Sequence, residues 1–183
     1  MNSVMLRLRL VGRTLWLSRA SCKASCSAIT IKRSTFMTKE IRFCLKADEA
    51  PSLPGAYAMA IELADTVVVM LSGRAPIALP AGRYLYCGSA KGPGGLKARL
   101  SRHMRRSKSV RWHVDQLTEQ GLVIGSWIFP GGDECRSVQM CSYLPMLIAG
   151  FGSSDCATCR SHLLRWSNGT ALLLPDADLC RRL

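Results

Sequence analysis

From residue 54 onward the chain alternates between apolar runs and breaks rich in glycine, proline and polar residues. The clearest apolar runs are residues 55–63, 66–71, 83–87 and 122–129. Runs of this length between turn signals predict strands. Only Ala64-Asp65 separates the first two runs, so these predict a β-hairpin. Residues 83–87 add a third strand, and the three together predict a small antiparallel sheet.

Three further segments have the apolar spacing of helices. They cover about residues 96–106, 110–120 and 133–144. In the first, Leu96, Leu100 and Met104 recur every four residues and form one apolar stripe. A glycine-rich turn at residues 88–95 precedes this helix and lets it begin close to the end of a strand.

The C-terminal part predicts a second hairpin. Residues 162–166 and 170–174 flank Asn168-Gly169, and Asn-Gly is a strong signal for a two-residue hairpin turn. The complete pattern therefore predicts an α+β fold, in which helices flank a small antiparallel three-stranded sheet and an extra β-hairpin follows at the C-terminal end.

The positive charge of the chain is unevenly distributed. The 183 residues have a net charge of +13, and residues 1–36 hold seven of the 25 Lys and Arg residues but none of the 12 acidic residues. This composition fits a mitochondrial-type transit peptide, a disordered basic tail, or a coding sequence whose translation really begins at Met37. We therefore expect residues 1–36 to be an extension that is disordered or mis-assigned, and residues 37–183 to form a single domain.

The overall composition is that of a globular protein, with 48% hydrophobic and 20% charged residues. No apolar run reaches the roughly 18 residues that a membrane-spanning helix needs, so we expect no membrane association. Nine cysteines without a regular framework favour free thiols in a reducing compartment. These features predict a cytoplasmic protein.

A second concentration of positive charge lies at residues 97–111, which hold seven basic residues and no acidic one. A patch of this kind predicts a polyanionic partner such as nucleic acid, and the alternative is a solvated helix face. The predicted nucleic-acid-binding residues are Lys91, Lys97, Arg102, Arg105, Arg106, Lys108 and Arg111.

The glycine-rich turn does not match the known nucleotide loops. It does not end in Gly-Lys-Ser/Thr, and the strands before it predict a hairpin rather than a βαβ unit. We interpret it as a flexible turn at a helix N-terminus, where backbone N–H groups favour an anion.

Four positions near this segment carry candidate chemistry. Arg99 and His103 lie four residues apart, so they share one side of the predicted helix at the edge of its apolar stripe. Together with Tyr86 they could bind a phosphate and move a proton, while a surface Arg beside a half-buried His is the alternative. Glu134 opens a predicted helix and could hold a divalent cation, while compensation of the helix dipole is the alternative.

These positions occur in an order that resembles the GIY-YIG nuclease superfamily. Gly55-Ala56-Tyr57 and Tyr86-Cys87-Gly88 each fall in a predicted strand, Arg99 and His103 follow in a helix, and Glu134 opens a later helix. The likeness is greater to a small prokaryotic branch that occurs alone or fused to an endonuclease III-like glycosylase. The segments similar to that branch are residues 53–57, 88–96, 112–115, 134–135, 150–156 and 161–163.

The resemblance implies divalent-metal-dependent cleavage of a DNA phosphodiester, on a small antiparallel three-stranded sheet flanked by helices. It implies that Tyr57 deprotonates or orients the attacking water and that Tyr86 hydrogen-bonds this water or the scissile phosphate. Arg99 would stabilise charge on the phosphate, and His103 would assist as a base or a phosphate ligand. Glu134 would hold Mg²⁺ or Mn²⁺. DNA, a role in repair and a repair glycosylase as a further partner follow from the same resemblance.

A possible zinc ligand set lies near the C-terminal end. Cys156-Ala-Thr-Cys159 is followed by His162, which is a spacing that can hold zinc, and Cys135 could lie nearby. The alternative, which a single C-x-x-C pair favours, is a group of buried free thiols.

Three functions therefore compete. The first is an endonuclease, which requires Tyr57, Tyr86, Arg99 and Glu134 to converge on one cleft. The second is a catalytically idle module of the same fold that binds nucleic acid. The third is a zinc-stabilised structural protein.

Overall fold

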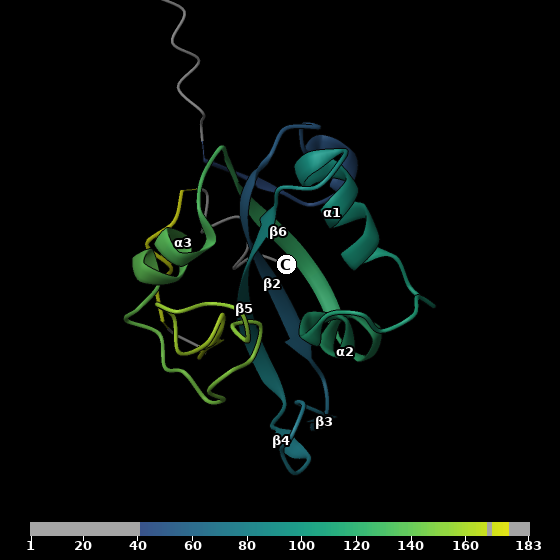
Figure 1. The fold of residues 1–183 in the computed structure, drawn as a ribbon, viewed down its shortest axis with the longest axis vertical. Helices are drawn as coiled ribbons and strands as arrows, with labels where there is room; N and C mark the ends of the chain where they lie inside the picture. The colour runs from purple at the N-terminus through teal and green to yellow at the C-terminus, as the bar shows by residue number, and fades with distance from the viewer. Residues whose placement is uncertain (1–40, 168–169, 176–183) are drawn as a thin grey trace, which may run out of the picture. The chain divides into compact units, whose positions relative to one another are not determined.

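The computed structural model describes residues 41–167 and 170–175 (Figure 1). The extension at residues 1–36 lies outside the described residues, so its nature and the boundary at residue 37 remain predictions. The described part is α+β, as predicted. Its main sheet contains β1 (Arg42–Cys44), β2 (Gly55–Leu63), β5 (Gly82–Ala90), β6 (Leu122–Pro130) and β7 (Leu163–Trp166).

The remaining elements are short. A separate two-stranded sheet pairs β3 (Val67–Val69) with β4 (Ile77–Leu79). The helices are α1 (Gly95–Met104), α2 (His113–Gln120) and α3 (Glu134–Met140), and a 3₁₀ turn covers Ala47–Glu49. The three predicted helices are all present, with shorter bounds than expected.

The main sheet has five strands and not three, which corrects the prediction. All its strand pairs are antiparallel and its order is β1–β6–β2–β5–β7. The predicted hairpin of residues 55–63 with 66–71 is also wrong, because β2 pairs with β5 and β6 while β3 pairs with β4. The physical reason is that β2 is apolar on both faces, so burial makes it the central strand with a partner on each side.

The predicted C-terminal hairpin is wrong as well. Strand β7 pairs with β5 at the edge of the main sheet, and the described residues 170–175 contain no strand. Leu172 and Leu174 are instead buried in the core around Trp127, whose indole N–H donates to the Pro175 carbonyl at 2.6 Å. Burial of these leucines against the sheet therefore replaces strand pairing.

The two faces of the sheet carry different cores. Tyr57, Met59 and Ile61 of β2 face one core, which includes Leu100 of α1 and Leu117 of α2. The alanines that alternate with them face a second core, built around Trp127 and Trp166. Figure 1 shows α1 and α2 on one side of the sheet ribbons and α3 on the other. Within the described part of the chain, no helix is both long and apolar enough to cross a membrane.

Candidate active site

Two tyrosines from neighbouring strands form the floor of the site. The β2–β5 register places Met59 opposite Tyr86 and Tyr57 opposite Gly88, so both tyrosine rings lie on the face covered by α1 and α2. Their ring centroids are 6.3 Å apart. Gly88 is needed here because a Cβ atom at that position would overlap the Tyr57 hydroxyl. The second predicted motif thus makes room for the side chain of the first.

Helix α1 brings His103 against Tyr57. The Tyr57 hydroxyl and His103 Nε2 are 3.0 Å apart, and both side chains are almost fully buried. Helix α1 can lie this close to the sheet because Gly95, at its first turn, has a positive φ of 56° and packs directly on the Leu53 carbonyl. The sequence grouped His103 with Tyr86, but the tyrosine that hydrogen-bonds His103 in the structure is Tyr57.

Asp115 of α2 completes a chain of three buried polar groups. Its Oδ1 atom is 3.0 Å from His103 Nδ1, and its Oδ2 atom accepts a 2.8 Å hydrogen bond from Arg102. The same oxygen also accepts from the backbone N–H groups of Arg111 and Trp112. The sequence interpretation did not select Asp115, although it is the first acidic residue after the basic run at residues 97–111.

The pKa shifts of Tyr57, His103 and Asp115 show where the protons lie in this row of hydrogen bonds. Burial disfavours ionisation of Asp115, but hydrogen bonds from His103 and from backbone N–H groups outweigh it and hold the pKa of Asp115 well below its usual range. Burial lowers the pKa of His103 and raises the pKa of Tyr57 well above its ordinary value. An ionised carboxylate can only accept, so His103 Nδ1 carries a proton and Nε2 accepts from the Tyr57 hydroxyl.

A stacked arginine forms the outer rim of the site. The guanidinium carbon of Arg99 lies 4.3 Å from the centre of the Trp112 ring, and that of Arg102 lies 4.4 Å from it. Trp112 is 38% exposed, so it presents a partly open aromatic surface beside two positive charges. Stacking of this kind restricts the Arg99 fork without neutralising its charge.

Glu134 enters the site from helix α3, which lies on the other side of the sheet ribbons from α1 and α2 (Figure 1). It opens α3, where Asp133 caps the helix by accepting from the backbone N–H groups of Cys135 and Arg136. The Oε2 atom of Glu134 is buried and has no hydrogen-bond partner among the described residues. An unpartnered carboxylate oxygen in such a position is suited to a cation ligand.

These side chains line one cavity of about 130 Å³, here called the central cavity. The predicted residues that line it are Tyr57, Tyr86, Arg99, His103 and Glu134. Trp112, Gly152, Asp155 and His162 line it as well. The structure thus brings together all five residues of the predicted catalytic set, while their individual roles remain predictions. Asp155 adds a second, exposed carboxylate that the sequence interpretation did not assign to the site.

The first backbone N–H groups of α1 are already hydrogen-bonded within the protein. The backbone N–H of Leu96 donates to the Leu53 carbonyl at 2.9 Å, and that of Lys97 donates to the Pro51 carbonyl at 3.2 Å. The interpretation of this helix N-terminus as an anion site is therefore wrong, because the chain before β2 already occupies these donors.

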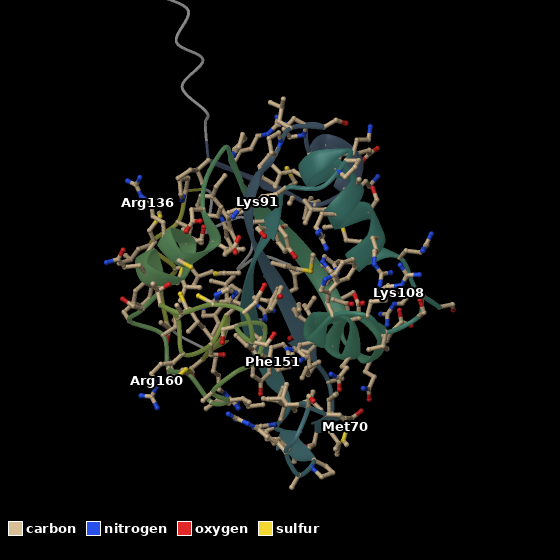
Figure 2. The ribbon with its side chains drawn as sticks, in the orientation of Figure 1. Met70, Lys91, Lys108, Arg136, Phe151 and Arg160 are labelled. Atoms are coloured by element: carbon tan, nitrogen blue, oxygen red, sulfur yellow. The ribbon has the colours of Figure 1, made fainter. Side chains whose placement is uncertain are left out.

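The predicted nucleic-acid-binding residues divide into two groups. Five are exposed, namely Lys91, Lys97, Arg105, Arg106 and Arg111. The other two are engaged inside the protein. Arg102 is bonded to Asp115, and the Lys108 ammonium is fully buried 2.7 Å from Glu119 of α2 (Figure 2). Contacts with nucleic acid would have to come from the exposed group.

A cluster of three cysteines and a histidine lies next to the central cavity. Cys135, Cys156, Cys159 and His162 each offer one ligand atom, and these four atoms lie within 4.8 Å of one another. This Cys₃His cluster could hold a metal ion. The structure therefore brings the predicted C-x-x-C and His162 together with Cys135, which the sequence placed as a possible neighbour and which follows Glu134 directly. All six cysteines in the described part of the chain are free.

Comparison with known proteins gives one family. Residues 56–180 match the family described as "Domain of unknown function DUF123", and this span covers more than half of the chain. The chain therefore belongs to the DUF123 family. The matched span contains the central cavity residues and the Cys₃His cluster. No curated protein and no solved structure matches the chain.

Proposed function

We infer that this protein is a divalent-metal-dependent endonuclease of the GIY-YIG type, which hydrolyses phosphodiester bonds of DNA. One observation carries the proposal. Two tyrosines, an arginine, a histidine and a glutamate, which come from four separate motifs of the sequence, line a single cavity of about 130 Å³. This set contains a proton acceptor, a fixed positive charge and a cation ligand, which hydrolysis of a phosphodiester requires.

The Tyr57–His103–Asp115 chain supplies the base. At rest, the Tyr57 hydroxyl donates a hydrogen bond to His103 and keeps its proton. A lone pair on the Tyr57 oxygen is therefore free to accept a proton from an attacking water. As that proton arrives, the proton of Tyr57 passes to His103 Nε2 across the 3.0 Å hydrogen bond. Asp115 stabilises the imidazolium that forms, because it is ionised and lies 3.0 Å from Nδ1. The high pKa of Tyr57 keeps it protonated at rest, so it acts as a relay and not as a standing anion.

Arg99 and Tyr86 supply the contacts to phosphate. Arg99 lines the central cavity and its guanidinium is stacked on Trp112. Because the stacking already restricts this side chain, the guanidinium can bind a phosphate with little further loss of side-chain freedom. Tyr86 is 6% exposed and burial raises its pKa, so it is present as a hydroxyl that donates a hydrogen bond. Both groups stabilise negative charge as it grows on the phosphate oxygens.

The Glu134 side of the cavity fits Mg²⁺ or Mn²⁺. The Oε2 atom of Glu134 is a buried oxygen without a hydrogen-bond partner in the described residues, and hard divalent cations prefer such ligands. Asp155 lines the same cavity and offers a second carboxylate. A cation held here would polarise a phosphate oxygen and the leaving group.

A neighbouring groove suggests how nucleic acid reaches the cavity. This groove has a volume of about 250 Å³ and shares Arg99 and Trp112 with the central cavity. The guanidinium groups of Arg99 and Arg102 both lie over the Trp112 ring, so the groove offers positive charge to a phosphate backbone. Exposed basic residues such as Lys97 and Arg105 extend the positive surface along α1. Action in DNA repair, a glycosylase partner and a cytoplasmic location remain predictions that extend this proposal.

The decisive experiment is a cleavage assay of the full chain on branched, nicked, single-stranded and plain duplex DNA. Reactions contain Mg²⁺, Mn²⁺ or no added divalent ion, without a chelator so that tightly held metal elsewhere is retained. We expect cutting only with an added ion, and its loss in Arg99→Ala. Arg83→Ala is the matched control, because Arg83 pairs with Glu62 at the far end of β5. Binding without cutting on every substrate would favour the catalytically idle module instead.

A further inference from the structure

Within the Cys₃His cluster, one pair of sulfur atoms has about the spacing of two ligands on one metal ion. The Sγ atoms of Cys135 and Cys156 are 3.5 Å apart. In a tetrahedral zinc site with Zn–S bonds of about 2.3 Å, neighbouring sulfurs are about 3.8 Å apart. Cys159 follows Cys156 at the C-x-x-C spacing of structural zinc sites, so three sulfurs come from only two chain segments.

His162 gives an independent indication of a ligand. The residue is 3% exposed, and its Nε2 atom is buried without a hydrogen-bond partner among the described residues. Buried polar nitrogens are nearly always paired, and an imidazole beside three thiols gains a partner by binding a metal. His162 is also firmly placed by its backbone, since its N–H donates to Phe151 and its carbonyl accepts from Cys87.

The chain around the cluster needs a stabilising element. Between the end of α3 and the start of β7, residues 141–162 contain no helix or strand. Irregular segments longer than about 15 residues are uncommon in compact domains unless something holds them. Three of the ligands lie in the C-terminal part of this segment and Cys135 lies in the first turn of α3, so one ion would join the segment to that helix.

From these observations we propose that Cys135, Cys156, Cys159 and His162 form a structural zinc site. Three thiolates and one imidazole form a closed tetrahedral set, and thiolates select zinc over Mg²⁺ or Mn²⁺. The zinc is therefore distinct from the cation assigned to Glu134. Figure 2 shows Arg136 and Arg160, the sequence neighbours of two ligands, with their side chains directed outward on the α3 side.

The site also has a consequence for the central cavity, which rests on the proposed function. Glu134 precedes the ligand Cys135, and His162 lines the central cavity itself. Zinc therefore acts as a positioning element, because it holds the first turn of α3 where the Glu134 carboxylate enters the cavity. Loss of zinc would displace Glu134 while the Tyr57–His103–Asp115 chain, which is built from β2, α1 and α2, stays in place.

The test begins with the metal content of the full chain purified without chelators. We expect about one zinc per chain, lost in Cys156→Ser and in Cys159→Ser. The matched control is Cys141→Ala, because Cys141 is a buried free cysteine outside the cluster. In the wild type, replacement of zinc by Co²⁺ should give the absorption of a tetrahedral thiolate site, and removal of zinc should lower the Tm by at least about 5 °C.

Two results would overturn the site, and neither depends on nuclease activity. One is wild-type protein that holds no zinc and gives no thiolate–cobalt absorption, which remains informative even when the variants do not fold. The other is a disulfide between Cys135 and Cys156 in the protein as purified under reducing conditions.

For the positioning role, zinc-depleted protein should lose cleavage with Mg²⁺ present and recover it on addition of one equivalent of zinc. Undiminished cleavage after complete zinc removal would overturn that role and leave the site itself standing.

Discussion

The central cavity has two walls, and they differ in how their polar atoms are satisfied. On the wall formed by α1 and α2, Tyr57, His103 and Asp115 are hydrogen-bonded to one another in sequence. On the wall formed by α3 and residues 141–162, Glu134 Oε2 and His162 Nε2 are buried without a partner in the described part of the chain. The first wall is satisfied by hydrogen bonds within the protein, and the second holds two unpaired atoms that the proposed metal ions would satisfy.

The difference follows from the elements that build each wall. Helices α1 and α2 pack on the sheet through continuous apolar stripes, so their polar groups are positioned by the core. The opposite wall consists of a short helix, in which Ser137 is the only buried residue, and an irregular segment. The first wall should therefore form without metal, whereas the geometry of the second should depend on it. On the first wall, Arg102 Nε is buried and has no partner among the described residues, while its guanidinium is stacked on Trp112.

The largest expected effect concerns the metal-dependent wall. Glu134→Gln removes the charge of a cation ligand but keeps its shape, so we expect cleavage to fall about 1,000-fold, on the order seen when one electrostatic stabiliser of a transition state is removed. Thermal stability should stay within about 0.5 kcal/mol, because the lost oxygen had no hydrogen bond to break. Single-turnover cleavage and Tm measure the two effects. Glu62→Gln is the control, because Glu62 lies at the end of β2 away from Tyr57 and the cavity. An equal loss of cleavage in both variants would exclude the role of Glu134.

The next effect concerns the complete wall and should show the opposite pattern. Asp115→Asn takes the charge from a fully buried carboxylate that serves both Arg102 and His103, so we expect stability to fall by about 3 kcal/mol. This loss should be the same in zinc-loaded and zinc-depleted protein, because the wall forms without metal. Urea unfolding of both forms measures it. A loss that disappears on zinc removal would show that the two walls are coupled.

A smaller effect is the response of the complete wall to acid. The pKa of His103 is lowered by burial, so below about pH 6.5 the unfolded chain binds a proton that the folded chain does not. Stability should therefore decrease as the pH falls through this range. In His103→Gln this contribution is absent, so the stability advantage of the wild type should shrink from pH 7.5 to pH 5.5. Burial also lowers the pKa of His113. His113 is present in both the wild type and His103→Gln, so its contribution cancels in the stability difference between them. A constant difference across this range would contradict the assignment of a buried neutral His103.

The smallest effect separates the exposed basic residues from the engaged ones. Lys97→Ala removes an exposed charge on α1 and should reduce the slope of log affinity against log salt by about one unit, if DNA binds there. Lys108→Ala should leave that slope unchanged and instead destabilise the protein by about 1–2 kcal/mol, because it breaks a buried contact with Glu119. Fluorescence anisotropy with labelled DNA at several salt concentrations measures the slopes. Equal slopes for Lys97→Ala and the wild type would exclude this surface.

Much of this architecture is determined by local sequence. The apolar stripe of α1 and the i, i+4 spacing of Arg99 and His103 depend on residues close together in the chain. Short-range periodicity therefore predicted the α+β class and the three helices, while the set of five candidate catalytic residues came from the resemblance to the GIY-YIG superfamily. The C-x-x-C pair was visible for the same reason.

Only the tertiary structure decided the rest. Strand β7 joins β5, and β3 leaves β2, because pairing of distant segments is selected by burial of both sheet faces and not by turn signals. Asp115 joins His103, and Cys135 joins the C-x-x-C pair, because packing brings α2 to α1 and α3 to the C-terminal segment. A lone acid or a lone cysteine has no local pattern. Its chemistry is set by the partners that folding places beside it.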